Sequence, residues 1–403
     1  MRPDLFAKCR QPQIYNHLQE AGLYPYFIPI ESSEGTEVEL QGRRALMFGS
    51  NNYLGLTHDP RVMEAARAAI AEYGTGCTGS RFLNGTLRLH LDLEERLARI
   101  MHKEAALVFS TGYQTCLGVI TALVRRDELI LCDRENHASI LDGCRLSFGE
   151  VRKYPHCDMD ALRRHLEATE DRARLIVTDG LFSMMGDLAP IPKIVELARE
   201  HGARVLVDDA HAFGVLGPHG TGTADHFGLN GDVDLVMATF SKSMAGIGGF
   251  VAGEREVIEF IQHNARTMIF SASVPPPVCA ASLACLDIIE QEPERRQRVL
   301  ELAARGRAGL QALGFNTGPS ETPVVPVILG NRERTFVFWK MLVEEGVFVN
   351  PVTTPGVPPG MDLLRCSFMA THTEEHVDRF LKAFERVRER LPAAATKPRT
   401  AAS

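Results

Sequence analysis

The feature that most constrains the fold is a regular alternation, from about residue 60 to residue 250, of short β-branched runs with longer helical patterns. The segment PRVMEAARAAIAEYG shows the helical pattern, because it opens with Pro60, ends at Gly74 and places apolar residues at helical spacing. Short apolar strands separated by amphipathic helices are typical of a mainly parallel sheet covered on both faces. The sequence therefore predicts an α/β fold. Its predicted strands are Ala106–Phe109, Leu129–Cys132, Arg174–Thr178, Arg204–Val207, Asp234–Ala238 and Gly249–Ala252.

The two ends of the chain show a different pattern of predicted strands and helices. Residues 36–48 predict two short strands around Gln41-Gly42, which would form a hairpin beside an N-terminal arm. After about residue 290, a charged helix is followed by further short strands and helices, which indicates a smaller α+β unit. We therefore expect an arm and hairpin at 1–50, a large domain at 51–290, a small C-terminal domain at 291–391 and a disordered tail at 392–403.

Composition argues against several classes of protein. A formal net charge of −7 is unlike that of a general nucleic-acid binder, which is usually basic. No stretch approaches the roughly 20 apolar residues of a membrane-spanning helix, and the N-terminus lacks a secretory hydrophobic region. The nine cysteines are scattered, without a C-x-x-C pair or zinc spacing. We therefore expect reduced core thiols in a cytoplasmic protein that binds no metal and no nucleic acid.

The segment RVLVDDAHAFG (204–214) carries the strongest chemical signal. Its apolar run ends in Asp208, and the carboxyl ends of parallel strands face the ligand crevice. A buried carboxylate there needs a cationic partner, and a protonated pyridine nitrogen would serve. His211, three residues later, could reach an oxygen of the same ring. On spacing alone, metal binding or helix capping by this aspartate stays open.

The segment ATFSKSMAGIGGF (238–250) places a lysine after another strand. A lysine such as Lys242 can form an imine with an aldehyde cofactor when its surroundings lower its pKa. Thr239 and Ser241 are short hydroxyl donors that suit a phosphate, and the nearby glycines permit close approach of a flat ligand. A P-loop would need a glycine-rich run before Lys242, and none is present at that spacing.

Two weaker signals complete the set. In FSTGYQT (109–115), Gly112 and Tyr113 would begin a helix whose free N–H groups favour an anion. In ENHASILDG (135–143), His137 precedes a helix and could lie over a ring, although a single histidine in this place is more often a surface or capping residue.

These segments together resemble the α-oxoamine synthases, a branch of the fold-type I pyridoxal-phosphate enzymes. The resemblance covers roughly residues 15–390. The matching motifs, in order, are NNYLGL (51–56), STGY (110–113), NHASILDG (136–143), TDGLFSMMGD (178–187), VDDAH (207–211), TFSKS (239–243) and FSASVPP (270–276). The segments GTGCTGSRFLNGT (74–86), GLYPYF (22–27) and LLRCSFMATHT (363–373) are most similar to the bacterial serine palmitoyltransferase branch of that family.

The resemblance implies a role for each residue around the cofactor, pyridoxal 5'-phosphate. Lys242 would carry the cofactor and act as the base at the substrate Cα. Asp208 would pair with the pyridine nitrogen, and His211 with the ring oxygen. His137 would stack above the ring while Ala210 packs beneath it.

The remaining implied roles are phosphate binding and recognition of the amino acid. The implied phosphate ligands are Gly112, Tyr113, Thr239, Ser241 and Ser271 of the partner subunit. The candidates for the amino-acid carboxylate are Asn52, Ser183, which would also border the cofactor, and Arg365, whose fork suits a carboxylate.

The resemblance further implies an obligate homodimer with shared sites and a decarboxylating condensation of L-serine with a long-chain acyl-CoA, as in the first step of sphingolipid biosynthesis. The lipid-like product is compatible with peripheral contact at the inner membrane. One alternative is a sister enzyme that uses glycine, alanine or an acyl-carrier-protein donor. A remote alternative is a non-catalytic regulator, which would typically lose the lysine or gain a DNA-binding module.

Overall fold

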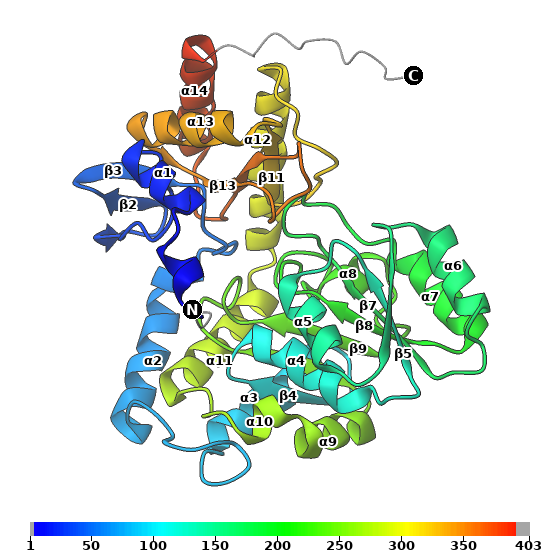
Figure 1. Ribbon diagram of the computed structural model, residues 1–403. Helices are drawn as coiled ribbons and strands as arrows, with labels where there is room; N and C mark the ends of the chain where they lie inside the picture. The colour runs from blue at the N-terminus through cyan, green and yellow to red at the C-terminus, as the bar shows by residue number, and fades with distance from the viewer. Residues whose placement is uncertain (1–3, 392–403) are drawn as a thin grey trace, which may run out of the picture.

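A seven-stranded sheet forms the centre of the larger part of the molecule (Figure 1). The computed structural model describes residues 4–391, so the tail predicted at 392–403 lies outside the described residues. The strands are β4 (Ala105–Phe109), β5 (Leu129–Asp133), β6 (Glu150–Tyr154), β7 (Arg174–Asp179), β8 (Arg204–Asp208), β9 (Leu235–Thr239) and β10 (Gly249–Gly253). They lie in the order β4-β10-β9-β8-β7-β5-β6. Only β10 runs antiparallel to its neighbours, so the predicted parallel core is confirmed.

All six strands predicted from the sequence are present, with ends that differ by at most one residue. Strand β6 was not predicted from the sequence, and its residues EVRKY are mostly polar. This strand lies at the edge of the sheet and pairs only with β5, and Tyr154 is its one buried residue. An edge strand needs no continuous apolar run, so it left no signal in the hydrophobic pattern.

Helices cover both faces of this sheet, as the alternation predicts. Because side chains alternate along a strand, Val205 and Val207 of β8 face one layer, while Leu206 and Asp208 face the other. The layer on the Leu206 side contains α4 (Gly112–Leu123), α5 (Ala138–Leu146), α9 (Arg255–Asn264) and α10 (Arg266–Ile269). The layer on the Val205 side contains α2 (Pro60–Tyr73), α3 (Arg88–Ile100), α6 (Met159–Glu167), α7 (Ile191–His201), α8 (Thr223–His226) and α11 (Pro276–Gln291).

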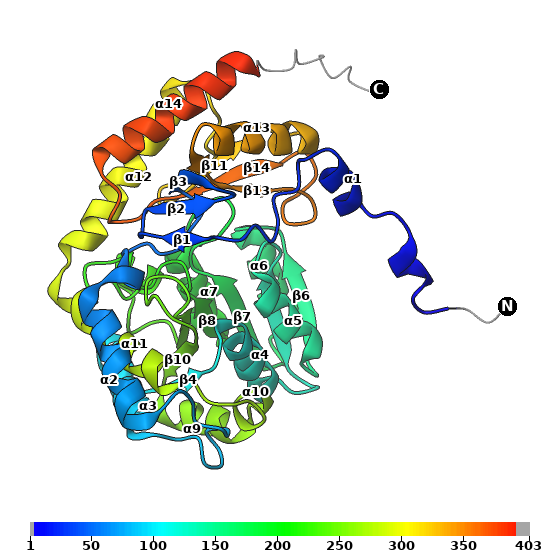
Figure 2. The ribbon, with the colours of Figure 1, turned by 90° about the vertical axis from the view of Figure 1, so that its left-hand side faces the viewer.

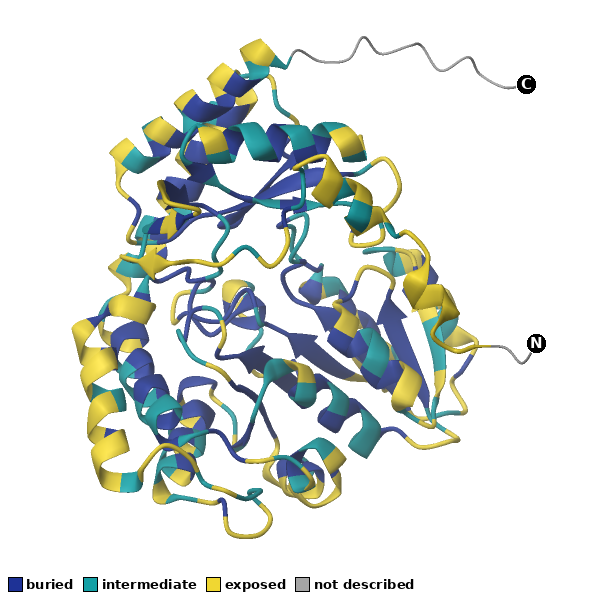
Figure 3. Cartoon of the chain, turned by 60° about the vertical axis from the view of Figure 1, so that its left-hand side comes forward, coloured by how far each residue is buried: buried dark blue, intermediate teal, exposed yellow. Residues whose placement is uncertain are grey.

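The C-terminal part forms a smaller α+β unit on a separate apolar core. Its antiparallel sheet has the order β11-β14-β13. The strands are β11 (Val324–Ile328), β13 (Asn350–Val352) and β14 (Leu363–Ser367), and the helices are α12 (Glu294–Ala312), α13 (Arg332–Glu344) and α14 (Glu374–Arg390). Figure 3 shows that the strands of both parts are buried, while the outer faces of the helices are exposed. Within residues 4–391, no helix combines the length and apolar character needed to cross a membrane.

The predicted N-terminal hairpin is present and joins the C-terminal part. It consists of β2 (Glu37–Leu40) and β3 (Arg43–Met47), and both turn residues, Gln41 and Gly42, have positive φ angles of 51° and 71°. Strand β3 pairs in parallel with β12 (Val347–Phe348), and β1 (Ser32–Ser33) pairs with β2. Before the hairpin, η1 (Ala7–Arg10) and α1 (Ile14–Glu20) form an arm that extends away from the body in Figure 2. A further short helix, η2 (Leu56–His58), precedes α2.

Candidate active site

A cavity of about 370 Å³ opens at the carboxyl ends of β7, β8 and β9. This edge is where parallel sheets bind ligands. Ten of the residues singled out from the sequence line this cavity, namely Gly112, Tyr113, His137, Ser183, Asp208, Ala210, His211, Thr239, Ser241 and Lys242. The segments that carry them are far apart in the sequence, so the fold brings together the residues that the resemblance assigned to one site.

Asp208 is a buried carboxylate without a cationic partner. It ends β8, and its Oδ1 accepts the N–H of Ala210 at 2.9 Å. It forms no ion pair with any of the residues 4–391. A buried charge with only neutral partners is unfavourable, which means that the site calls for a cation to complete it. A protonated pyridine nitrogen meets that need.

Asp179 is a second carboxylate in the cavity and was not predicted as a site residue. It ends β7 directly beside Asp208, and its Oδ2 accepts the backbone N–H of His137 at 2.9 Å. Burial and the adjacent Asp208 raise the pKa of Asp179 well above its ordinary value. Asp179 therefore holds the start of α5, and with it His137, against the cavity.

Lys242 supplies an amine that has no partner within the described chain. Its ammonium makes no ion pair and no hydrogen bond with residues 4–391, and it lines the same cavity as Asp208. Burial lowers the pKa of Lys242 to about 8, although Asp208 opposes this effect. On the order of a tenth of this side chain is therefore a neutral amine, the nucleophilic form, at pH 7, far more than for an exposed lysine.

The N-terminus of α4 and the β9–β10 connection form a cradle for an anion. The first N–H groups of α4, at Gly112 and Tyr113, have no intrahelical acceptors and face the site with the positive end of the helix dipole. Thr239 Oγ1 lies 2.9 Å from Ser241 Oγ. A Cβ atom on Gly112 would lie 2.7 Å from that of Thr239, so only glycine permits this approach. The cradle fits a phosphate.

His211 is linked to Arg365 through Tyr53, a residue that was not predicted to belong to the site. The Tyr53 hydroxyl lies 2.6 Å from Nδ1 of His211, and Nη2 of Arg365 donates to the same hydroxyl at 3.3 Å. A guanidinium only donates, so the Tyr53 proton is free to point at Nδ1. Burial and nearby positive charges lower the pKa of His211 well below its ordinary value. The neutral imidazole therefore carries its proton on Nε2, where it can donate to a ring oxygen.

Arg365 is a buried cation whose partners are all neutral. Its side chain donates from Nε to the Ser183 carbonyl at 2.5 Å, and from Nη1 to Asn51 Oδ1 and Ser367 Oγ, both at 2.9 Å. It has no acidic partner within residues 4–391. The positive charge beside the cavity is thus available for an anionic substrate group.

Three predicted site residues do not line the cavity of their own chain: Arg365, which lies behind Ser183, and Asn52 and Ser271. Asn52 uses its amide locally, since it donates to Thr57 Oγ1 at 2.8 Å and accepts the N–H of Leu56 at 3.0 Å. The preceding Asn51 contacts Arg365 instead. Ser271 accepts a hydrogen bond from Gln114 at 3.0 Å beside the first turn of α4, outside the cavity.

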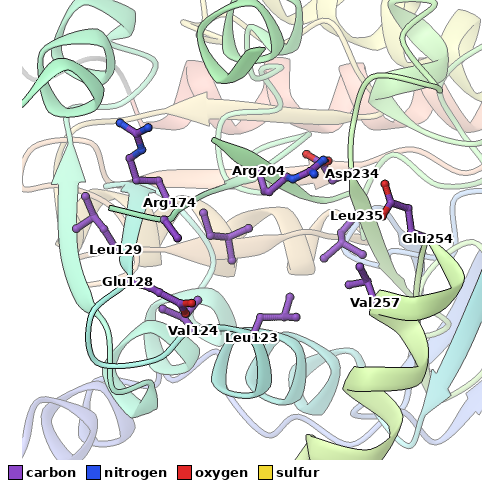
Figure 4. A pocket seen from close by; sticks show the side chains of 12 residues that line it. Leu123, Val124, Glu128, Leu129, Arg174, Arg204, Asp234, Leu235, Glu254 and Val257 are labelled. Atoms are coloured by element: carbon purple, nitrogen blue, oxygen red, sulfur yellow. The ribbon is translucent and has the colours of Figure 1, made fainter. Parts of the chain in front are cut away.

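A second cavity, of about 230 Å³, lies at the opposite ends of the strands (Figure 4). Leu129, Arg174, Arg204 and Leu235, which begin β5, β7, β8 and β9, all line it. Leucine and valine make up half of the residues that line it, and Arg204 forms an ion pair with Asp234 at 2.6 Å. No lysine, histidine, cysteine or hydroxyl side chain lines this cavity, so it lacks the groups that the chemistry requires.

Asp133, His156 and Cys157 have the spacing of metal ligands but form an ion-pair cluster. Both imidazole nitrogens of His156 face carboxylates, at 3.2 Å from Asp133 and 2.8 Å from Asp187. Although burial opposes it, hydrogen bonding to these carboxylates raises the pKa of His156 to about 12. The two ion pairs of His156 tie the ends of β5 and β6 to the loop after β7.

Comparison with known proteins identifies the family of this chain. Residues 43–384 match the family aminotransferase class I and II. The serine palmitoyltransferase of Sphingobacterium spiritivorum is 51% identical over 375 residues, which cover 93% of this chain and 94% of that protein. The 8-amino-7-oxononanoate synthase of Geobacter sulfurreducens is 46% identical and covers 93% of this chain and 96% of its own length. The solved structure of Sphingomonas wittichii serine palmitoyltransferase has a TM-score of 0.92 at 36% identity and covers 96% of this chain and 99% of that chain. The chain therefore belongs to the aminotransferase class I and II family.

Proposed function

We propose that this chain is a pyridoxal-phosphate enzyme that condenses L-serine with a long-chain acyl-CoA such as palmitoyl-CoA. The products are CoA, CO2 and a 3-keto long-chain base. This reaction is the first step of sphingolipid biosynthesis. One observation carries the chemistry: a single cavity holds an unpaired amine, Lys242, and a buried carboxylate without a cation, Asp208. The similarity to serine palmitoyltransferases, at 51% identity in one case, supports the choice of substrates.

The cavity has a complementary group for each part of the cofactor. The α4 cradle suits the phosphate, Asp208 suits the pyridine nitrogen, and His211 can donate to the ring oxygen. When bound, pyridoxal phosphate supplies an electron sink for negative charge at the substrate Cα. Asp208 keeps that sink effective, because its negative charge favours protonation of the ring nitrogen.

The chain's own side chains then hold the substrate and move its proton. Arg365 supplies the charge for the serine carboxylate, with Ser183 beside it. A guanidinium–carboxylate ion pair is stronger than the contact of Arg365 with the neutral Tyr53 hydroxyl at 3.3 Å, so a carboxylate can replace it. Lys242 takes the proton from Cα. The Cα–carbon bond forms as the CoA thiolate leaves the thioester. CO2 then leaves the β-keto acid, and the Lys242 ammonium returns its proton to Cα, where the loss of CO2 leaves an electron pair.

The protonation of Lys242 makes cofactor capture depend on pH. Because burial lowers the pKa of Lys242 to about 8, the neutral amine fraction rises as pH rises through that value. We expect the rate of covalent attachment of pyridoxal phosphate to cofactor-free protein to rise with pH and level off above about pH 9. Stopped-flow absorbance measures this rate. A midpoint near 10, as for an exposed lysine, would contradict the buried environment assigned to Lys242.

We also propose a homodimer in which the two copies share their active sites. Ser271 lies outside its own cavity, and the adjoining Ala272 bridges to Ser80 at an exposed surface that includes Phe82 and Phe270. In such a dimer, Ser271 of the partner subunit would complete the phosphate cradle. We place the enzyme in the cytoplasm, with its lipid-like product drawing it to the inner face of the membrane.

A sister reaction is the second candidate. The similarity to 8-amino-7-oxononanoate synthases, at 46% identity for the Geobacter sulfurreducens protein, is not far below that to the first candidate. The cofactor residues cannot distinguish the two, because both reactions would use the same amine, carboxylate and cradle. The amino acid and the acyl donor therefore decide between them.

An activity matrix tests the proposed function. Serine, glycine and alanine are each combined with palmitoyl-CoA, a short acyl-CoA and an acyl-carrier-protein donor, and the products are identified by mass. We expect serine with palmitoyl-CoA to give the highest kcat/KM. A preference for alanine or glycine would move the chain to the sister reaction. Product formation by Lys242→Ala at the wild-type rate would reject both.

A further inference from the structure

Cys116 is a buried thiol that contacts the carboxylate of Asp208, and the proposed mechanism gives it no role. It lies one turn into α4 and is 1% exposed. Its Sγ lies 3.3 Å from Oδ2 of Asp208 and 3.0 Å from Sδ of Met237. Of the nine cysteines, this one contacts the carboxylate expected to face the cofactor ring.

The thiol acts as a hydrogen-bond donor to this carboxylate. Burial and the charge of Asp208 raise the pKa of Cys116 well above its ordinary value, so the sulfur keeps its proton. Asp208 is then held at both oxygens, because Ala210 donates its N–H to Oδ1 while Cys116 donates to Oδ2. Two donors from different elements fix the rotation of the carboxylate about its Cβ–Cγ bond.

The position of Cys116 on α4 couples the two ends of the cofactor site. The first turn of this helix forms the phosphate cradle at Gly112 and Tyr113, and the next turn carries Cys116. The same rigid helix therefore sets both the phosphate position and the plane of the Asp208 carboxylate. A thiol is a weak donor, so it can orient the carboxylate while leaving its charge available to the ring.

We propose that Cys116 is a positioning residue, which holds the Asp208 carboxylate in the orientation that receives the pyridine N–H of the cofactor. This inference rests on the proposed cofactor and on the role given to Asp208. It predicts that loss of the S–H donor weakens cofactor retention and turnover together. A residue that only fills the core would change stability alone.

The variants Cys116→Ala and Cys116→Ser test this role. Alanine removes the donor, while serine keeps a donor at nearly the same place. We expect Cys116→Ala to lower kcat by roughly threefold to tenfold and to shorten the half-time of cofactor loss during dialysis of the holoenzyme by a similar factor. KM for serine should change less than kcat. Serine should restore both quantities to within about twofold of wild type.

Cys144→Ala is the matched control. Cys144 is also buried in the layer between the sheet and α5, but it makes no hydrogen bond to Asp208. This variant should lower Tm while leaving kcat and cofactor retention unchanged. In an Asp208→Asn background, Cys116→Ala should have little further effect on cofactor retention, because the carboxylate that it orients is gone.

Three outcomes would overturn the inference. Cys116→Ala could behave as Cys144→Ala does, serine could fail to restore retention, or the two substitutions at 116 and 208 could act independently. Failure of the proposed function looks different: the wild-type holoenzyme would retain cofactor but form no product with serine, and the retention measurements would still decide the role of Cys116. A wild-type protein that binds no pyridoxal phosphate would reject both.

Discussion

Lys242→Ala is expected to lower turnover by on the order of 10²–10⁴-fold, the range that a positioned base contributes. Lys242 is the amine that lines the cavity between the α4 cradle and Asp208, and it has no partner within the described chain. Alanine removes both the covalent anchor for the cofactor and the base at Cα. Product formation followed by mass spectrometry, under saturating serine and acyl-CoA, measures the loss. Because alanine leaves space rather than adding bulk, the fold should survive.

Lys193→Ala is a suitable control for this substitution. Lys193 is partly exposed on α7 and, among residues 4–391, pairs only with Glu196, at 2.8 Å. Its loss should change neither turnover nor cofactor content. If Lys242→Ala kept more than a tenth of wild-type turnover, the assignment of Lys242 as the reactive amine would fail.

Asp208→Asn is expected to lower kcat by on the order of 10²–10³-fold, as for loss of a major electrostatic contact in an active site. Asparagine has nearly the shape of aspartate, so the N–H of Ala210 keeps an acceptor and the cofactor should still bind. The neutral side chain cannot favour a protonated ring nitrogen, and the electron sink weakens. Steady-state kinetics together with cofactor content separate this loss of kcat from a loss of binding.

Asp209→Asn provides a matched control one residue away. Asp209 is also buried, but its side chain accepts hydrogen bonds from Thr223 at 2.6 and 3.0 Å rather than lining the cavity. Burial raises the pKa of Asp209 to about 7. Its substitution should lower Tm with little effect on kcat. Equal kinetic losses in the two variants would show that Asp208 acts only through the fold.

Within the seven-stranded sheet, the strands that the sequence revealed are those buried on both faces. Strands β4, β5, β7, β8, β9 and β10 are short apolar runs that lie between helical layers. Because they are apolar, their sequences indicate that they are buried. Strand β6 has a polar edge position and left no such pattern. The pairing of β3 with β12 joins residues about 300 positions apart, and hydrophobic periodicity carries no information about such long-range partners.

The candidate site likewise contains residues that the local sequence indicated and residues that it did not. Asp208, His211, Lys242 and Gly112 lie at strand ends and helix starts, so their local sequence indicated their place. Tyr53 and Cys116 were missed because their importance comes from contacts with His211 and Asp208 across the fold, 158 and 92 residues away. Asn52 has the residue type expected of a carboxylate ligand, but the turn that follows it uses both ends of its amide.

The central claim is that one particular lysine forms the bond to the cofactor, and reductive trapping tests it directly. Holoenzyme is treated with borohydride, which makes the link permanent, and the digested protein is mapped by mass spectrometry. We predict a phosphopyridoxyl group on Lys242 and on no other lysine of the chain. A protein that binds pyridoxal phosphate stoichiometrically but carries the label elsewhere, or carries none, would contradict the account.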